Sequence, residues 1–153
     1  MATNTERLAE LGIELPAVAA PVAAYVPAVK VGNQVWTSGQ LPFVEGKLPA
    51  TGKVGDAVSP EDAQAYARQA ALNALAAVDA LVGIDNVTRV LKVVGFVASA
   101  EGFGGQPAVL NGASNLMGDV FGEAGAHARS AVGVAELPLD APVEVEIVVE
   151  VTS

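Results

Sequence analysis

The chain has 153 residues, the length of one ordinary domain, and we expect a single domain over residues 1–153. It carries 8 Lys and Arg against 17 Asp and Glu, a formal net charge of −9, so a polyanion would be repelled and nucleic-acid binding is disfavoured. It has no Cys and a single His, which excludes disulfides, thiolate chemistry and a cluster of His or Cys metal ligands, and we expect neither a metal nor a cofactor.

The chain begins with a predicted N-terminal extension over residues 1–20. Asn4 or Thr5 can cap a short helix that ends at Gly12. This region has no apolar signal core, and the apolar stretch 15–31 is interrupted by three prolines and is too short to cross a bilayer. We therefore expect a cytoplasmic protein that does not contact membranes.

Residues 29–38 are predicted to form a β-hairpin with the pair Gly32-Asn33 at its turn. Ser38 ends the second strand, where a serine ordinarily supplies a hydrogen bond. Gly39 follows, and a glycine at a strand end permits a bulge or the close approach of another chain segment.

Two helices and a buried strand follow the hairpin. Ser59 is a strong helix cap followed by Pro60, and the apolar spacing continues to Val82. An apolar strand is expected over residues 87–98, and a second amphipathic helix over residues 107–121.

The C-terminal part is predicted to contain two strands joined by a turn with a proline. Arg129 lies at the head of the first strand between small residues, which leaves room for a guanidinium to hold a ligand carboxylate through two hydrogen bonds. Glu144 begins the second strand, 143–151, and a glutamate there can accept protons or orient water. If the two strands are neighbours, Arg129 and Glu144 face one cavity.

His127 is the single histidine and precedes Arg129 by two positions. It can carry protons, or it can simply pack at the start of the strand, and we favour the second role.

Strands outnumber helices in this order, and hairpins require antiparallel pairing, so the pattern predicts an α+β two-layer sandwich. We expect a mostly antiparallel mixed sheet with two helices on one face. Two helices cannot cover both faces of such a sheet, and the uncovered face would need a partner.

Several segments together resemble the RidA/YjgF family: Ala128–Val132, Leu137-Pro138, Val143–Glu146 and, far upstream, Val35–Pro42. The resemblance spans about residues 25 to 151. It implies a chorismate-mutase-like protomer that assembles as a homotrimer with ligand clefts between subunits. It departs from the usual pattern at Ala131, where many members carry Cys, which implies a divergent subgroup.

The resemblance also implies residue roles. Arg129 would clamp a substrate carboxylate, and Glu144 would orient water or move protons. Asn111 and Asn115 both lie on the second helix, where the family often places an asparagine near the site, and spacing alone does not separate them. The residues expected to line the substrate site are Tyr25, Ser38, Gly39, Asn115 and Ala131.

The activity implied is the hydrolysis of reactive enamines or imines, such as 2-aminoacrylate, to 2-keto acids and ammonia. A non-catalytic protein that binds a small carboxylate such as a 2-keto acid is the alternative. The family also carries the name endoribonuclease, which the net charge of −9 disfavours here.

Overall fold

The computed structural model describes residues 2–18 and 24–153, so residues 1, 19 and 20 of the predicted extension lie outside the described part. The helices are α1 (Asn4–Glu10), α2 (Pro60–Val82) and α3 (Gln106–Phe121), with short 3₁₀ turns η1 (Ile84–Asn86), η2 (Gly122–Gly125) and η3 (Pro138–Asp140). The strands are β1 (Ala28–Val31), β2 (Gln34–Thr37), β3 (Val87–Ala98), β4 (Ala128–Val134) and β5 (Val143–Val151).

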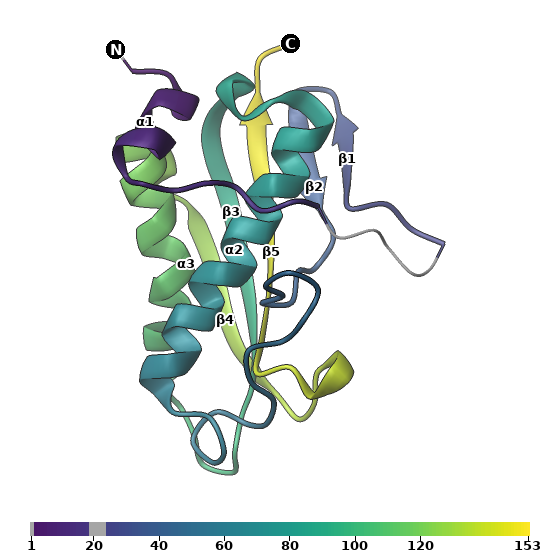
Figure 1. The fold of residues 1–153 in the computed structure, drawn as a ribbon, viewed down its shortest axis with the longest axis vertical. Helices are drawn as coiled ribbons and strands as arrows, with labels where there is room; N and C mark the ends of the chain where they lie inside the picture. Colours follow the sequence, from purple (N-terminus) through teal and green to yellow (C-terminus); the bar gives the residue numbers. More distant parts are fainter. Residues whose placement is uncertain (1, 19–23) are drawn as a thin grey trace.

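The strands form one sheet in the order β1-β2-β5-β3-β4. Only the pair β3 and β4 is parallel among the named strand pairs, and the other three pairs are antiparallel. Figure 1 shows α2 and α3 side by side over one face of this sheet, with α1 near one end of α3. The predicted α+β sandwich with a mostly antiparallel mixed sheet and two helices on one face is confirmed.

The sequence left open whether the strands that carry Arg129 and Glu144 are neighbours, and they are not. The strand that carries Arg129 does not pair with the strand that carries Glu144, because β3 lies between them. A short turn with a proline between two strands is typical of a hairpin. In the structure β3 pairs with β4 instead and occupies the place beside β4 that β5 would take in a hairpin.

The core lies between the sheet and the helices. On β5 the residues at odd positions from Val143 to Val151 are all buried, whereas those at even positions are partly or fully exposed. On α2 most of the buried residues are alanines. Their small side chains let the helix approach the sheet and α3 closely, as expected for an amphipathic helix that covers a β-sheet.

The local signals at the helix starts are mostly confirmed. Ser59 caps α2, since its hydroxyl accepts a hydrogen bond from the Asp62 backbone N–H at 3.1 Å. The cap of α1 is Thr3 rather than Asn4 or Thr5. The Asn4 side chain does not cap the helix, because it donates to the carbonyl oxygens of Ile84 and Val87, which are distant in sequence.

The second sheet face has no helix over it within the described residues. Several large apolar side chains on or beside this open face are more than two-fifths exposed: Val29, Val31, Trp36 and Val132. Exposed apolar side chains gathered on one face commonly mark a surface that a partner covers. None of the described helices combines the length and the apolar character needed to cross a membrane.

Candidate functional site

Arg129 is held by helix α3. One of its terminal nitrogens, Nη1, donates to Asn111 Oδ1 at 2.8 Å and to Ser114 Oγ at 3.2 Å. Asn111 and Ser114 are three residues apart on α3, so they lie on the same side of the helix. The predicted site residue Asn115 is exposed and is not among the Arg129 partners, so the structure brings Asn111 to the arginine instead.

Arg129 has no carboxylate partner within the part of the chain that the structure describes. The ion pairs found there are Arg7 with Glu10 and Lys53 with Glu136. The two hydrogens on Nη1 serve Asn111 and Ser114, and no described residue takes the hydrogens on Nε and Nη2. A partly buried guanidinium with a free edge is suited to a bidentate carboxylate ligand.

Glu144 packs against the backbone of Gly39. A β-carbon placed on Gly39 would lie 2.5 Å from Glu144 Oε2 and 2.7 Å from its Cδ. A larger residue there would displace the Glu144 carboxylate, which agrees with the close approach expected at Gly39. Burial raises the pKa of the Glu144 carboxyl, and the nearby charge of Glu146 raises it further.

Arg129 and Glu144 lie on opposite faces of the sheet. Arg129 is in register with Val93, which is fully buried under the helices. Glu144 alternates with buried β5 residues and is in register with Phe96 on the open face. Residues in register across a sheet share a face, so one protomer cannot bring these two side chains into one cavity.

The other predicted residues also fall into two groups, one near Arg129 and one near Glu144. Ala131 is in register with Gly95, on the face of Arg129, and is half-buried there. Ser38 is the residue after β2 and adjoins Gly39. Its hydroxyl donates to the Val26 carbonyl oxygen at 2.6 Å, which ties down the segment that carries Tyr25.

Tyr25 is 53% exposed and precedes β1, at the sheet edge opposite β4. The protomer therefore carries two separate groups of candidate site residues, which are the predicted residues and Ser114. The arginine half-site consists of Asn111, Ser114, Arg129 and Ala131. The glutamate half-site consists of Tyr25, Ser38, Gly39 and Glu144.

His127 does more than pack at a strand start. Its Nε2 lies 2.9 Å from Ser114 Oγ, and its Nδ1 lies 2.6 Å from the Gly125 carbonyl oxygen. Sequence reasoning did not find Ser114, because a serine inside an amphipathic helix carries no signal of its own. Its spacing of three from Asn111 was the available clue.

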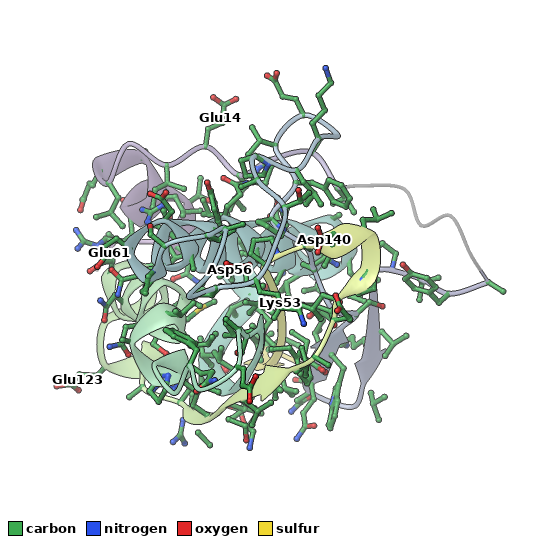
Figure 2. All side chains as sticks on the ribbon, turned by 90° about the horizontal axis from the view of Figure 1, so that it is seen from below. Glu14, Lys53, Asp56, Glu61, Glu123 and Asp140 are labelled. Atoms are coloured by element: carbon green, nitrogen blue, oxygen red, sulfur yellow. The ribbon has the colours of Figure 1, made fainter. Side chains whose placement is uncertain are left out.

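A cavity of about 720 Å³ lies elsewhere, between the N-terminal segment, the loop after Gly39 and α2. Its lining includes Glu14, Phe43, Gln69 and Asn73, and none of the predicted site residues. Figure 2 shows Glu14 pointing outward from the body of the protein rather than into it. No group of three or more metal-ligating side chains occurs among the residues described.

A family model described as YjgF/chorismate mutase-like, which also carries the name endoribonuclease, matches residues 5–151. The protein TCP17 of Trypanosoma cruzi is 45% identical over 100% of this chain and 95% of its own length. The 2-iminobutanoate/2-iminopropanoate deaminase of Escherichia coli K12 is 36% identical over 84% of this chain and 88% of its own.

Solved structures of proteins with similar sequences share the fold of this chain. The Agrobacterium tumefaciens protein Atu1372 is 46% identical and superposes with a TM-score of 0.89 over 99% of this chain and 94% of its own. Escherichia coli TdcF, solved with bound serine, is 29% identical with a TM-score of 0.64 over 90% of this chain and 94% of its own.

Proposed function

This chain belongs to the YjgF/chorismate mutase-like family, and from that premise we propose that it is an enamine and imine deaminase. Its substrates are reactive 2-aminoacrylate-type intermediates, and its products are 2-keto acids and ammonia. The observation that carries the proposal is the guanidinium of Arg129, which has a free hydrogen-bonding edge and no described carboxylate partner.

The substrate carboxylate binds the free edge of Arg129, through the hydrogens on Nε and Nη2. 2-Aminoacrylate first tautomerises to 2-iminopropanoate. Water then adds to the imine carbon, and Glu144 takes a proton from that water and returns one to the nitrogen. In the resulting carbinolamine, Glu144 moves the hydroxyl proton to the amine nitrogen as the carbon–nitrogen bond breaks, and pyruvate and ammonia leave.

The raised pKa of Glu144 suits this role. A carboxyl that exchanges protons with water and with a departing amine works best when its pKa lies close to the working pH. Burial and the charge of Glu146 move the Glu144 pKa in that direction from its ordinary value.

The complete site requires two copies of the chain. The arginine half-site and the glutamate half-site are on opposite faces of one sheet, so the Glu144 that serves a given Arg129 comes from a neighbouring copy. We propose a homotrimer, in which the open apolar face of each sheet is covered and each copy offers both half-sites to its neighbours.

Two relatives support the substrate class. The Escherichia coli deaminase acts on 2-iminobutanoate and 2-iminopropanoate by its name, and both are small 2-imino acids with a carboxylate. TdcF was solved with serine, a small amino acid that also offers a carboxylate.

The test generates 2-aminoacrylate in place, from serine with a serine/threonine dehydratase, and follows pyruvate formation. Addition of this protein should increase the rate of pyruvate release above that of spontaneous hydrolysis. The Arg129→Ala variant, at equal concentration, is the control and should give only the spontaneous rate. An identical pyruvate rate with and without the wild-type protein would refute the deaminase proposal.

A non-catalytic carboxylate-binding protein is the second candidate, because TdcF shows that a relative of this fold can hold serine. Binding of 2-oxobutyrate by the wild-type protein, without any acceleration of pyruvate release, would favour this candidate.

A further inference from the structure

Four groups form a continuous chain of hydrogen bonds next to the arginine half-site. The Gly125 carbonyl oxygen lies 2.6 Å from His127 Nδ1, and His127 Nε2 lies 2.9 Å from Ser114 Oγ. Ser114 Oγ in turn lies 3.2 Å from Arg129 Nη1. The single imidazole of the protein is thus connected to the Arg129 guanidinium through one hydroxyl.

The partners at the two ends fix the direction of every hydrogen. A carbonyl oxygen only accepts, so His127 Nδ1 carries its hydrogen and donates to Gly125. The neutral ring then has a lone pair on Nε2, and the Ser114 hydroxyl donates to it. Since Arg129 only donates, the Ser114 oxygen accepts from Nη1 at the same time.

This arrangement orients the guanidinium. Ser114 and Asn111 together occupy both hydrogens of Arg129 Nη1. A carboxylate that pairs with Arg129 at two points must therefore approach the side formed by Nε and Nη2, because the other edge is already occupied.

Packing of the turn η2 against α3 places the imidazole. Gly125 is buried, and a β-carbon there would collide with the Met117 carbonyl oxygen on α3. The close approach that this glycine permits brings His127, two residues later, within reach of Ser114 on the same helix.

We propose that Ser114 and His127 are positioning residues for Arg129, which keep the Nε and Nη2 edge of its guanidinium directed at a ligand carboxylate. This inference rests on the proposed function, since it takes the ligand to be a small carboxylate at Arg129.

Four charged residues lie on the elements around His127. They are Arg129 on β4, Glu123 on η2, Asp119 on α3 and Lys92 on β3. Glu123 and Asp119 are exposed, and Glu123 extends away from the protein at the edge of Figure 2. Of the four, Arg129 is the one that a hydrogen-bonded residue joins to the imidazole.

The first experiment is nitrogen-15 NMR of the imidazole, which needs no assignment because the protein contains one His. At pH 8 the neutral ring should carry its hydrogen on Nδ1, and Ser114→Ala should shift the Nε2 resonance. A ring that carries its hydrogen on Nε2 at pH 8 would overturn the hydrogen-bond chain, whatever the activity of the protein.

The second experiment measures the Kd of 2-oxobutyrate by calorimetry. Ser114→Ala and His127→Gln should each bind about fivefold more weakly than the wild-type protein, the lower end of usual coupling between two sites. Ser114→Thr, which keeps the hydroxyl, should bind more nearly as the wild-type protein does.

Wild-type affinity in both Ser114→Ala and His127→Gln would overturn the inference while leaving the proposed function in place. A wild-type protein that binds no 2-oxobutyrate would refute the proposed substrate class, and the inference with it.

Discussion

Arg129 is distinguished by its partners rather than by its residue type. Its side chain bonds to an amide oxygen and a hydroxyl, neither of which carries charge. An arginine retained for stability alone would be expected to pair with a carboxylate, and Glu144 and Glu146 are directed to the other face of the sheet. The positive charge therefore stays available for a ligand.

Arg129→Ala should abolish 2-oxobutyrate binding and leave the protein folded, because the hydrogen bonds that it removes go to two uncharged side chains, Asn111 and Ser114. Removing one partner of a desolvated charge pair costs about 2–5 kcal/mol, so affinity should fall at least about tenfold. Arg129→Lys should restore binding only in part, because an ammonium lacks the planar fork. Calorimetry and thermal melting on the same samples measure both effects.

Arg68→Ala, which removes an arginine on α2 outside both half-sites, is the matched control and should bind normally. A large loss of stability in Arg129→Ala, with unchanged turnover per folded protein, would contradict the assignment of Arg129 as the ligand anchor.

Glu144→Gln should raise the melting temperature at pH 7 and remove deaminase activity. The folded state raises the pKa of Glu144 above its ordinary value of 4.5, so folding disfavours the charged carboxylate. The associated stability is present at low pH and is lost as the pH rises through the folded pKa. A neutral glutamine avoids that loss at pH 7, whereas at pH 3.5 the two proteins should melt alike. Melting curves at both pH values test this, and a lower melting temperature for the variant at pH 7 would contradict it.

At the scale of secondary structure, the end of β2 and the start of β5 form one functional unit. Gln40 and Val145 exchange backbone hydrogen bonds of 2.8 and 3.0 Å, which holds Gly39 next to Glu144. The position of the carboxylate therefore depends on a backbone contact as much as on the rotamer of Glu144.

Gly39→Ala should lower deaminase activity without unfolding the protein. The added methyl group would lie within 2.5 Å of Glu144 Oε2 and must displace that carboxylate. Displacement of a catalytic group by about 1 Å can cost about a hundredfold in rate. Gly104→Ala is the control, because a β-carbon there meets no atom within 4 Å. The dehydratase-coupled assay compares the two variants, and equal activity would show that Glu144 does not need its observed position.

For the whole molecule, the two half-sites make a prediction about assembly. Arg129→Ala and Glu144→Gln should each be inactive alone, but mixed trimers formed by refolding them together should regain activity. A random equal mixture places an intact Arg129 beside a neighbour with an intact Glu144 in about one quarter of the sites. Up to about a quarter of wild-type pyruvate release is therefore expected. No recovery in trimers shown to be mixed would indicate that one copy supplies both residues.

Light scattering provides the matching physical measurement. The wild-type protein at micromolar concentration should have about three times the mass of one chain, because exposed apolar side chains on the open face require a cover. A monomer mass would contradict both the trimer and a site shared between copies.

Local signals in the sequence determined the elements and their order. The Gly32-Asn33 turn, the Ser59 cap and the alternation along 143–151 each depend on neighbours in the chain, and each has the predicted structure. The family match likewise came from short segments, and it extends over residues 5–151. Arg129 was singled out in the same way, as a residue of unusual type for its local setting, whereas Glu144 was singled out through the family resemblance.

Tertiary structure alone decided how these residues meet. Strand order is set by packing of the whole sheet, so β3 between β4 and β5 was not visible in the turn that joins the last two strands. The choice of Asn111 as the partner of Arg129 depends on how α3 lies against β4. The link from His127 to Ser114 depends on the close approach of η2 to α3 at Gly125, a contact between atoms distant in sequence, which no local pattern specifies.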